Sequence, residues 1–314
     1  MQTNETRLDF AAFKEELCRR VLELLGEAYS TELAEVKKNN GVLKEVLHVR
    51  QHGSECIPCF YTEELYRSYC MGENEAGLAE HLVNIVRGEC ETVKEQVNLF
   101  LSKEWMTEHL FLRLVHYEEN KEYLEDAVYL KYLDFACVVY VLTESTEDGV
   151  KSFLLPTHVW DTLELGTIEE CFSKLIENTK RLFPEDMACI SAEEAEESIP
   201  GVRSISVTIR WMDSAEELLP EWLYVVTNHR RINGAAVLLY QEILKQWGER
   251  YGGDYYIIPS SIHEVLLLKA TEEDRAERLN AMVREVNETH VAPEERLSDH
   301  VYYYSVSEEE LQMR

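Results

Sequence analysis

The sequence predicts an α+β fold in which amphipathic helices pack on one or more mixed or antiparallel sheets. Segments with apolar residues at helical spacing and short runs rich in β-branched and aromatic residues follow one another irregularly. They lack the strand–helix alternation of a parallel α/β sheet. Hydrophobic residues make up 45% of the 314 residues, which is enough for one large core or two smaller ones, and no solenoid-type repeat is visible.

The first of two expected lobes spans residues 1–115 and has a helix–hairpin–helix order, with a single compact chain as the alternative. Apolar residues recur at helical spacing up to Leu25, and Gly26 ends this first helix. The dipeptide Asn40-Gly41 is typical of a hairpin turn and lies between two strand-like runs. The expected elements are a helix over 10–25, strands over 33–36, 42–49 and 56–61, and helices from 62 to about 101 with a break at 71–74.

The second expected lobe, residues 116–314, is α+β. Residues 110–116, just before it, are compatible with either a strand or a helix. Thr167 and Glu170 have the spacing of a capping box, in which each side chain binds a free amide at a helix start. The acidic segment 191–198, followed by Pro200-Gly201, is expected to be an exposed linker or surface helix. The other expected elements are strands over 134–142, 150–155, 202–211, 222–227, 255–258, 264–268 and 301–304, the last at a sheet edge, and helices over 167–182, 235–251 and 271–289.

The charge balance argues against general nucleic-acid binding. Lys and Arg number 31 against 60 Asp and Glu, so the formal net charge is −29 and the pI is about 4.7. A duplex binder gains most of its affinity from cations that replace phosphate counterions, and the basic cluster His229-Arg230-Arg231 is too small to supply this. The opposite interpretation, an acidic mimic of nucleic acid, fits the sign of the charge. Solubility alone explains many acidic surfaces.

The lack of export signals and the distribution of cysteines both predict a protein of the reducing cytoplasm. No stretch of about 18 uncharged apolar residues occurs, and the polar start of the chain lacks a signal-peptide layout, so we expect a cytoplasmic protein with no membrane association. The eight cysteines are scattered, and several lie on apolar stripes. In a reducing compartment they are expected to be free thiols that act as small hydrophobic residues.

Several short motifs follow one another in order along nearly the whole chain. They are Lys37-Lys38-Asn39-Asn40-Gly41-Val42, Asn120 with Leu133-Asp134-Phe135, Glu177-Asn178-Thr179, Tyr224-Val225-Val226-Thr227-Asn228, Asn233-Gly234-Ala235-Ala236, Ile258-Pro259-Ser260-Ser261-Ile262-His263-Glu264-Val265, and Met282-Val283 through Asn287 to Leu297-Ser298-Asp299. In this order they resemble a bacterial family known as domain of unknown function 5688. The resemblance implies no reaction, cofactor or catalytic residue.

The sharpest metal candidate is the set His48, His52, Cys56 and Cys59. A Cys-x-x-Cys pair can place two thiolates on a tetrahedral zinc ion, and the histidines lie close by in sequence. The second pair of common zinc modules is missing, and residues 58–62 depart from the pattern that the resemblance leads us to expect. Partly buried free thiols are the favoured interpretation, redox use of the pair is less favoured, and we predict neither a bound metal nor a cofactor.

The best catalytic candidate is the turn that contains Ser260, Ser261, His263 and Glu264. A serine nucleophile needs a base within hydrogen-bond reach and a third group that orients this base, and these residue types occur here together. On an extended strand, however, Glu264 faces away from Ser261 and His263, and no Gly-x-Ser-x-Gly elbow is present. A polar turn whose serines bind backbone amides is the favoured alternative.

A ligand-binding candidate precedes the helix expected over 235–251. Asn228, Asn233 and Gly234 lie before its start, where free amides could bind an anion, and Arg230 and Arg231 would supply positive charge. An Asn-Gly turn beside a solvated basic pair is the favoured alternative. His-Glu-x-x-His, the P-loop and the dinucleotide-binding glycine motif are all absent from the sequence.

These observations favour an interaction or regulatory protein over an enzyme. The missing catalytic motifs, the acidity and the aromatic C-terminal region predict that a surface of the second lobe binds another macromolecule, with a protein as the expected partner. A hydrolase that uses the turn around Ser260 and His263 is the first alternative, and an acidic nucleic-acid mimic is the second.

Overall fold

The fold is described from a computed structural model. It describes residues 7–54, 57–100, 102–146, 149–196, 203–213, 218–219, 223–270 and 275–314. The chain divides into two compact units, with residues 1–38 and 42–102 in unit 1 and residues 39–41 and 103–314 in unit 2. Helices and three antiparallel sheets in the described ranges confirm the α+β class. No helix in these ranges has both the length and the apolar character needed to cross a membrane.

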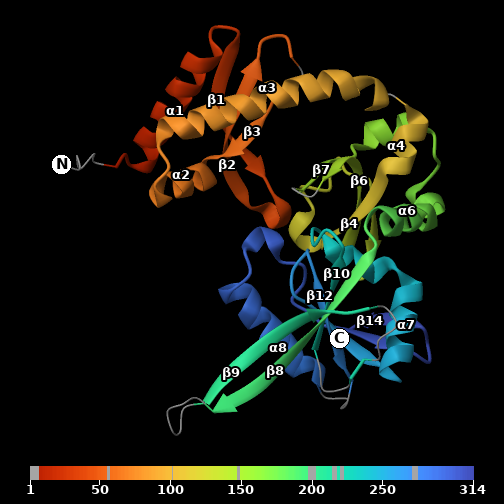
Figure 1. The fold of residues 1–314 in the computed structure, drawn as a ribbon. Helices are drawn as coiled ribbons and strands as arrows, with labels where there is room; N and C mark the ends of the chain where they lie inside the picture. The colour runs from red at the N-terminus through yellow and green to blue at the C-terminus, as the bar shows by residue number, and fades with distance from the viewer. Residues whose placement is uncertain are drawn as a thin grey trace. The chain divides into compact units, whose positions relative to one another are not determined.

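Unit 1 has the expected helix–hairpin–helix order (Figure 1). Its elements are α1 (Phe10–Leu25), β1 (Tyr29–Lys37), β2 (Leu43–Gln51), β3 (Cys59–Tyr61), α2 (Thr62–Met71) and α3 (Glu75–Phe100), with β2 between β1 and β3 in an antiparallel sheet. The Asp9 carboxylate caps α1 by accepting an amide hydrogen bond, and Gly26, with φ of 80°, ends it. Phe13, Leu17 and Val21 form its buried face, which packs along the first half of α3.

Unit 2 begins with a helix and a four-stranded sheet. Its first elements are α4 (Lys103–His109), β4 (Leu110–His116), the 3₁₀ helix Glu118–Asn120, β5 (Tyr129–Tyr132), β6 (Phe135–Thr146), β7 (Gly149–Leu154), α5 (Thr157–Leu163) and α6 (Ile168–Leu182). β6 pairs antiparallel with β4, β5 and β7, and its residues 135–142 are all buried, as a continuous apolar run predicts. The Thr167–Glu170 capping box is present at the start of α6.

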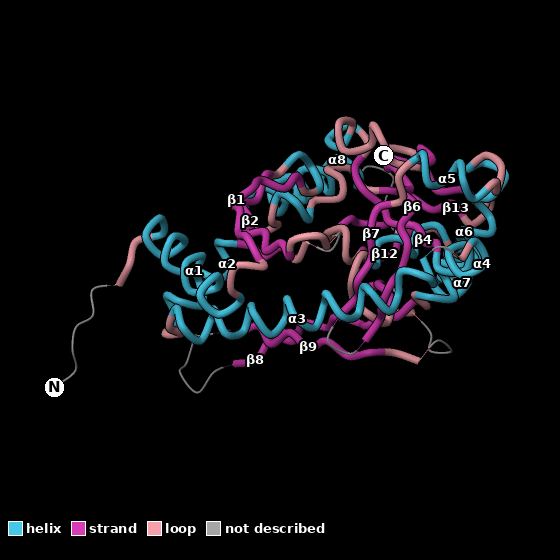
Figure 2. Tube along the Cα trace, turned by 90° about the horizontal axis from the view of Figure 1, so that it is seen from above, coloured by secondary structure: helices cyan, strands magenta, loops and turns pink. Residues whose placement is uncertain are grey.

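A seven-stranded antiparallel sheet completes unit 2. Its strands are β8 (Glu185–Glu196), β9 (Arg203–Trp211), β10 (Leu223–Asn228), β11 (Tyr255–Pro259), β12 (Val265–Lys269), β13 (Tyr302–Ser305) and β14 (Glu310–Met313), in the order β14-β13-β11-β12-β10-β8-β9. The helices are the 3₁₀ helix Gly234–Leu239, α7 (Gln241–Tyr251), α8 (Arg275–Thr289) and the 3₁₀ helix Pro293–Glu295. β8 and β9 form a long arm that extends past the other strands (Figures 1 and 2).

One hydrophobic core joins the two sheets of unit 2. It includes Leu112 and Val139 from the four-stranded sheet, Tyr224 and Ile257 from the seven-stranded sheet, and Trp247 from α7. Met106 of α4 and Leu110 of β4 belong to the same core. The units therefore divide between 102 and 103, whereas the sequence pattern places the boundary near 115.

Three local expectations are wrong, each because a distant segment decides the conformation. Residues 191–196 belong to strand β8 and not to a linker or surface helix, because they pair with residues 203–208 of β9, while 197–198 lie outside the described residues. The strand expected over 301–304 is not at an edge, because β13 pairs with β11 on one side and with β14 on the other. The helix expected over 235–251 begins as the six-residue 3₁₀ helix, whose Ala235 amide donates to the distant Ile262 oxygen (3.2 Å), and α7 follows only from Gln241.

Candidate functional site

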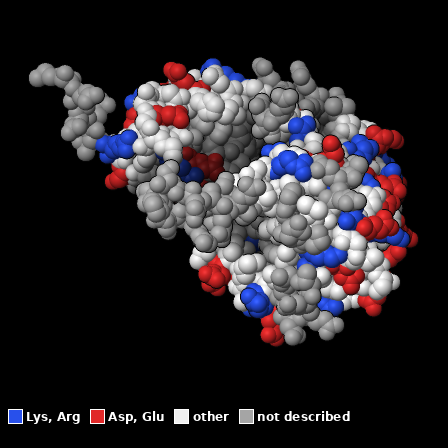
Figure 3. All heavy atoms as spheres, turned by 60° about the horizontal axis from the view of Figure 1, so that its bottom comes forward, with Lys and Arg blue, Asp and Glu red and all other residues white. Residues whose placement is uncertain are grey.

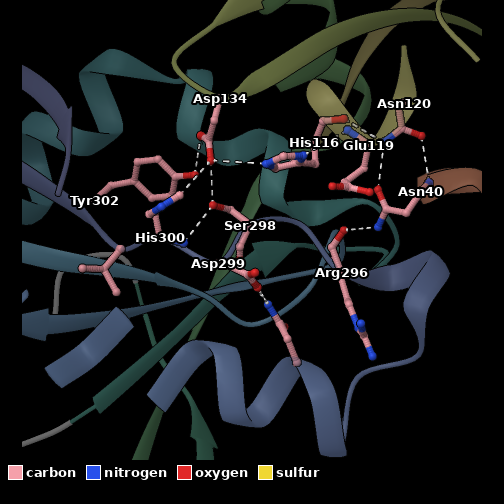
Figure 4. A network of polar contacts seen from close by, with 12 residues as sticks. Asn40, His116, Glu119, Asn120, Asp134, Arg296, Ser298, Asp299, His300 and Tyr302 are labelled. Carbon is pink, nitrogen blue, oxygen red and sulfur yellow. Dashed lines mark hydrogen bonds and ion pairs between the residues drawn. The ribbon is translucent and has the colours of Figure 1, made fainter. Parts of the chain in front are cut away.

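A polar cluster of unit 2 that joins several segments is centred on Asp134, in the two-residue turn between β5 and β6 (Figure 4). The Tyr302 hydroxyl donates to its Oδ1 (2.6 Å), and the Ser298 hydroxyl donates to its Oδ2 (2.7 Å). Burial and the neighbouring Asp134 carboxylate raise the pKa of Tyr302 well above the usual tyrosine value, so its hydroxyl stays a donor. Each oxygen of the Asp134 carboxylate thus accepts a hydroxyl hydrogen bond, which ties the β5–β6 turn to Ser298 and to the first residue of β13.

Two histidines approach the same carboxylate from different segments. His116 Nε2 lies 3.8 Å and His300 Nδ1 lies 3.7 Å from Asp134 Oδ2. The Glu119 amide donates to His116 Nδ1 (3.3 Å), so in the neutral imidazole the proton is on Nε2 and faces Asp134. His300 Nδ1 is buried without a hydrogen-bond partner among the described residues.

The turn Asn39–Gly41 contributes a second set of contacts. Asn40 has a left-handed backbone (φ of 58°), and its amide donates to Asn120 Oδ1 while Asn120 Nδ2 donates to Asn40 Oδ1, both at 2.8 Å. The Asn40 side-chain amide also donates to the carbonyls of Pro293 and Arg296, each at 2.8 Å. Asn120 is almost fully buried, and its side chain also donates to the His116 carbonyl (2.8 Å). These paired amides hold three distant segments in one place.

A third buried amide orders the segment 298–299. Asn287 of α8 donates through Nδ2 to the Ser298 carbonyl (3.0 Å) and to Asp299 Oδ1 (2.7 Å). The Ser298 hydroxyl accepts the amide hydrogen of His300 (3.0 Å) in addition to donating to Asp134. Ser298 therefore acts as a turn-forming side chain with both hydrogen-bonding roles occupied.

Between these groups lies a pocket of about 290 Å³. Its lining residues are Asn40, His116, Glu119, Pro293, Arg296, Leu297, Ser298 and Asp299. The volume is near the lower end of the range for small-molecule sites, and the hydrogen bonds above fix the backbone and several side chains of the wall. Two larger hollows, of about 850 and 540 Å³, lie in unit 1. In the larger one the charged groups of α1 pair with each other, as Glu16 does with Arg19 and Arg20.

The serine turn predicted as a catalytic candidate has a different geometry from a triad. The Ser260 hydroxyl donates to Glu264 Oε1 (3.2 Å), and the Ser261 hydroxyl accepts the backbone amide of His263 (3.0 Å). His263 Nδ1 accepts the Asn233 amide (3.0 Å), and His263 Nε2 lies 3.7 Å from Glu295 Oε1. Among the described residues, neither serine hydroxyl is hydrogen-bonded to the imidazole. The described contacts are those of a polar turn.

The predicted anion-binding residues are likewise engaged locally. Asn228 donates to the Ile232 carbonyl (2.8 Å) and accepts the Arg230 amide (3.0 Å), which forms an Asx turn. Arg230 also donates to the Thr146 carbonyl (3.0 Å), and the Arg231 guanidinium lies 3.9 Å from the centroid of the Trp211 ring. The helix that begins at Gly234, directly after Asn233, has only six residues, and its Ala235 and Ala236 amides bond to protein carbonyls.

The predicted metal candidate is only partly described. Cys56 lies outside the described residues, and His48 of β2 is the register partner of Cys59 in β3. Cys59 and His52 are exposed. Within the described residues no group of three or more His, Cys, Asp and Glu side chains is arranged to hold a metal ion.

Sequence reasoning did not single out the cluster around Asp134 as a site. His116 and His300 belong to no recognisable motif. Asn40, Asn120 and Asp134 are named in the sequence analysis as part of the motifs that resemble the family and not as site residues. The usable signal was a set of polar residues inside those motifs. Several of them are buried here, which is unusual for asparagine and requires hydrogen-bond partners.

Fold and pocket define the class of this protein as a two-unit α+β protein with a preformed polar pocket in unit 2. The sequence model of a family described as "Family of unknown function (DUF5688)" matches residues 10–306. The chain belongs to this family, which confirms the resemblance seen in its motifs. No curated protein and no solved structure gives a match. Residues from three of the motifs that carry the resemblance meet at or beside the pocket: Asn40, Asn120 with Asp134, and Asn287 with Ser298 and Asp299.

Proposed function

We propose that this protein is a cytoplasmic binding protein that recognises a small polar molecule in the pocket lined by Asn40, His116 and Asp299. The observation that supports the proposal is the convergence of polar side chains from distant stretches on one pocket. Several are held by hydrogen bonds to other buried groups, so little conformational entropy remains to be lost when a ligand binds.

The pocket wall contains polar groups that are hydrogen-bonded to the protein and, among the described residues, one carboxylate that is not. Asn40, Ser298 and one oxygen of Asp299 already bond to the protein. The Glu119 carboxylate makes no hydrogen bond or ion pair with the described residues and lies on the pocket wall beside His116 (Figure 4). Such an arrangement suits recognition, because a rigid frame presents a small number of free polar groups to the ligand.

Equilibrium dialysis tests this proposal. The purified chain is dialysed against a small-molecule extract of its native cytoplasm, and the retained compounds are identified by mass spectrometry. We expect at least one polar compound to be enriched by the wild type and lost in Glu119→Trp, because an indole at this position would fill the pocket mouth.

Glu125→Trp is the matched control, because Glu125 is also an exposed glutamate of unit 2 and does not line the pocket. This variant should retain the compound at the wild-type level. If no retained compound distinguishes the wild type from Glu119→Trp, the proposed function is wrong.

A second candidate is the binding of a protein partner at β9. Its alternate residues Val207, Ile209 and Trp211 are 59%, 60% and 38% exposed, and in the described part of the sheet β9 pairs only with β8. The open edge and apolar row suit one occupant, an extended segment of another protein that adds a strand with apolar residues at alternate positions.

A pull-down from native cytoplasm at moderate salt tests the β9 surface. Ile209→Glu places a charge in the middle of the apolar row, so we expect the retained partner to decrease at least about tenfold. Met282→Glu is the control, since Met282 is an exposed apolar residue of α8 outside β9. Equal retention by the wild type and Ile209→Glu would reject β9 as the docking strand.

The two remaining interpretations receive less support. The hydrolase interpretation lacks a bond between either serine of the 260–264 turn and the His263 imidazole. A nucleic-acid mimic would need carboxylates arrayed in a stripe. On the face drawn in Figure 3 the described Lys and Arg side chains are interspersed among the Asp and Glu side chains.

A further inference from the structure

We infer that the ligand of the unit 2 pocket carries an organic cation, an ammonium or guanidinium group, which the pocket carboxylates recognise. This inference rests on the proposed function and names the chemical class of its ligand. It follows from the charges on the pocket wall and from where each charged side chain is directed.

Glu119 provides the first negative charge. Its carboxylate is directed toward the space between His116 and Asn40, and it has no partner among the described residues (Figure 4). Its own backbone amide donates to His116 Nδ1, which places the carboxylate and the imidazole on the same wall. Both carboxylate oxygens are therefore available as acceptors for a ligand N–H group.

Asp299 provides the second negative charge. One of its oxygens accepts the Asn287 amide (2.7 Å), and this bond fixes the carboxylate, leaving the second oxygen available. Asp134 adds a further carboxylate behind His116, 3.8 Å from its Nε2. The pocket wall and the layer behind it thus carry three acidic side chains.

Among the described residues of the pocket wall, Arg296 is the only Lys or Arg, so the two wall carboxylates outnumber it. Its Nε donates to the Val291 carbonyl (3.3 Å), and Figure 4 shows its guanidinium directed away from Asn40 and Glu119. Two carboxylates face one guanidinium on this wall, and this excess of negative charge attracts a cation and repels an anion.

The cation is an organic group and not a metal ion. The described residues contain no set of three His, Cys, Asp and Glu side chains placed to hold a metal, and a divalent ion prefers several close oxygen or nitrogen ligands. An ammonium group instead has three N–H donors, which can reach separate acceptors such as the Glu119 and Asp299 carboxylates. The Asp299 carboxylate, held by Asn287, and the unbonded Glu119 carboxylate together offer separate acceptors for this donor set.

A matched series of small probes tests the sign of the charge. Butylamine, butanol and butyrate have the same chain and differ in charge, and binding is followed by the ring-proton NMR signal of His116, which His116→Gln identifies. We expect butylamine to bind at least about tenfold more tightly than butanol, since a charge-assisted hydrogen bond is worth more than a neutral one. Butyrate should bind least.

Conservative variants show which carboxylates cause the preference for butylamine. Glu119→Gln and Asp299→Asn remove one charge and keep an oxygen acceptor, so each should weaken butylamine about five- to tenfold and leave butanol unchanged. Glu125→Gln, which removes an acidic charge outside the pocket, should leave all three probes unchanged.

The outcomes separate this inference from the proposed function. Equal binding of the three probes, a preference for butyrate, or no His116 shift with butylamine overturns the cationic ligand. If the dialysis experiment still shows a retained compound that Glu119→Trp loses, the binding function stands with a different ligand class. If dialysis also shows none, both are wrong.

Discussion

Replacement of Gly234 by alanine will destabilise unit 2 by about 3 kcal/mol or more, because the added methyl group has no space. A Cβ at this position would lie 2.1 Å from Thr227 Oγ1, 2.4 Å from the His263 carbonyl oxygen and 2.7 Å from the Asn228 amide nitrogen. Two of these atoms are backbone, so relief requires the backbone at residue 234 to move away from β10 and from the 260–264 turn. Urea unfolding followed by tryptophan fluorescence measures the loss, since all five tryptophans lie in unit 2.

Gly88→Ala is the matched control. Gly88 lies within α3 of unit 1, and a Cβ there would meet nothing within 4 Å. We expect this change to leave the tryptophan-detected transition unchanged and to stabilise α3 by about 0.5–1 kcal/mol, as alanine does relative to glycine inside a helix. A Gly234→Ala protein that unfolds at the wild-type urea concentration would show that the close approach around Gly234 is incorrect.

The second large effect is expected at Asp134. Asp134→Ala leaves the Ser298 hydroxyl and the fully buried Tyr302 hydroxyl without their acceptor, so we expect unit 2 to lose about 2–4 kcal/mol of unfolding free energy. Asp134→Asn keeps one carbonyl oxygen and should lose less. Tryptophan-detected urea unfolding measures both variants.

Asp161→Ala controls for the loss of an acidic residue from unit 2. Asp161 is exposed on α5 and its side chain makes no contact with this cluster, so the expected change is within about 0.5 kcal/mol. If Asp134→Ala were as stable as Asp161→Ala, the hydrogen bonds from Tyr302 and Ser298 would have no net structural role, and the frame of the pocket would need another explanation.

Most elements could be predicted because their signals are local. The helical spacing up to Leu25, the break at Gly72 and the capping box at Thr167 each depend on residues within one or two turns, and the structure has all three. The ambiguity over 110–116 was resolved by pairing with β6, which no local pattern contains. The same reason explains the error over 191–198, where an acidic composition concealed a strand that β9 completes.

The candidate sites show the same limit at the level of side chains. Ser260, Ser261 and His263 were predicted as a catalytic candidate because they are close in sequence. In the structure the two serine hydroxyls bond to Glu264 and to the His263 amide, which belong to the same turn. The Asp134 cluster depends on long-range hydrogen bonds, including one from Asn40 to the Arg296 carbonyl across 256 positions of the chain. Residues so far apart in the chain have no short, regular spacing, so a sequence motif cannot identify them as a group.

By itself the sequence determined the α+β class, the position of most helices and strands, and the family, because these depend on local periodicity, turn chemistry and the order of short motifs. Only the tertiary structure decided which strands are neighbours and that residues 39–41 belong to unit 2. It also decided that Asn120 and Asp134 bond to Asn40 and Ser298 of the pocket wall. The physical reason is that buried polar groups must find partners, and those partners come from whichever segments the hydrophobic core brings together.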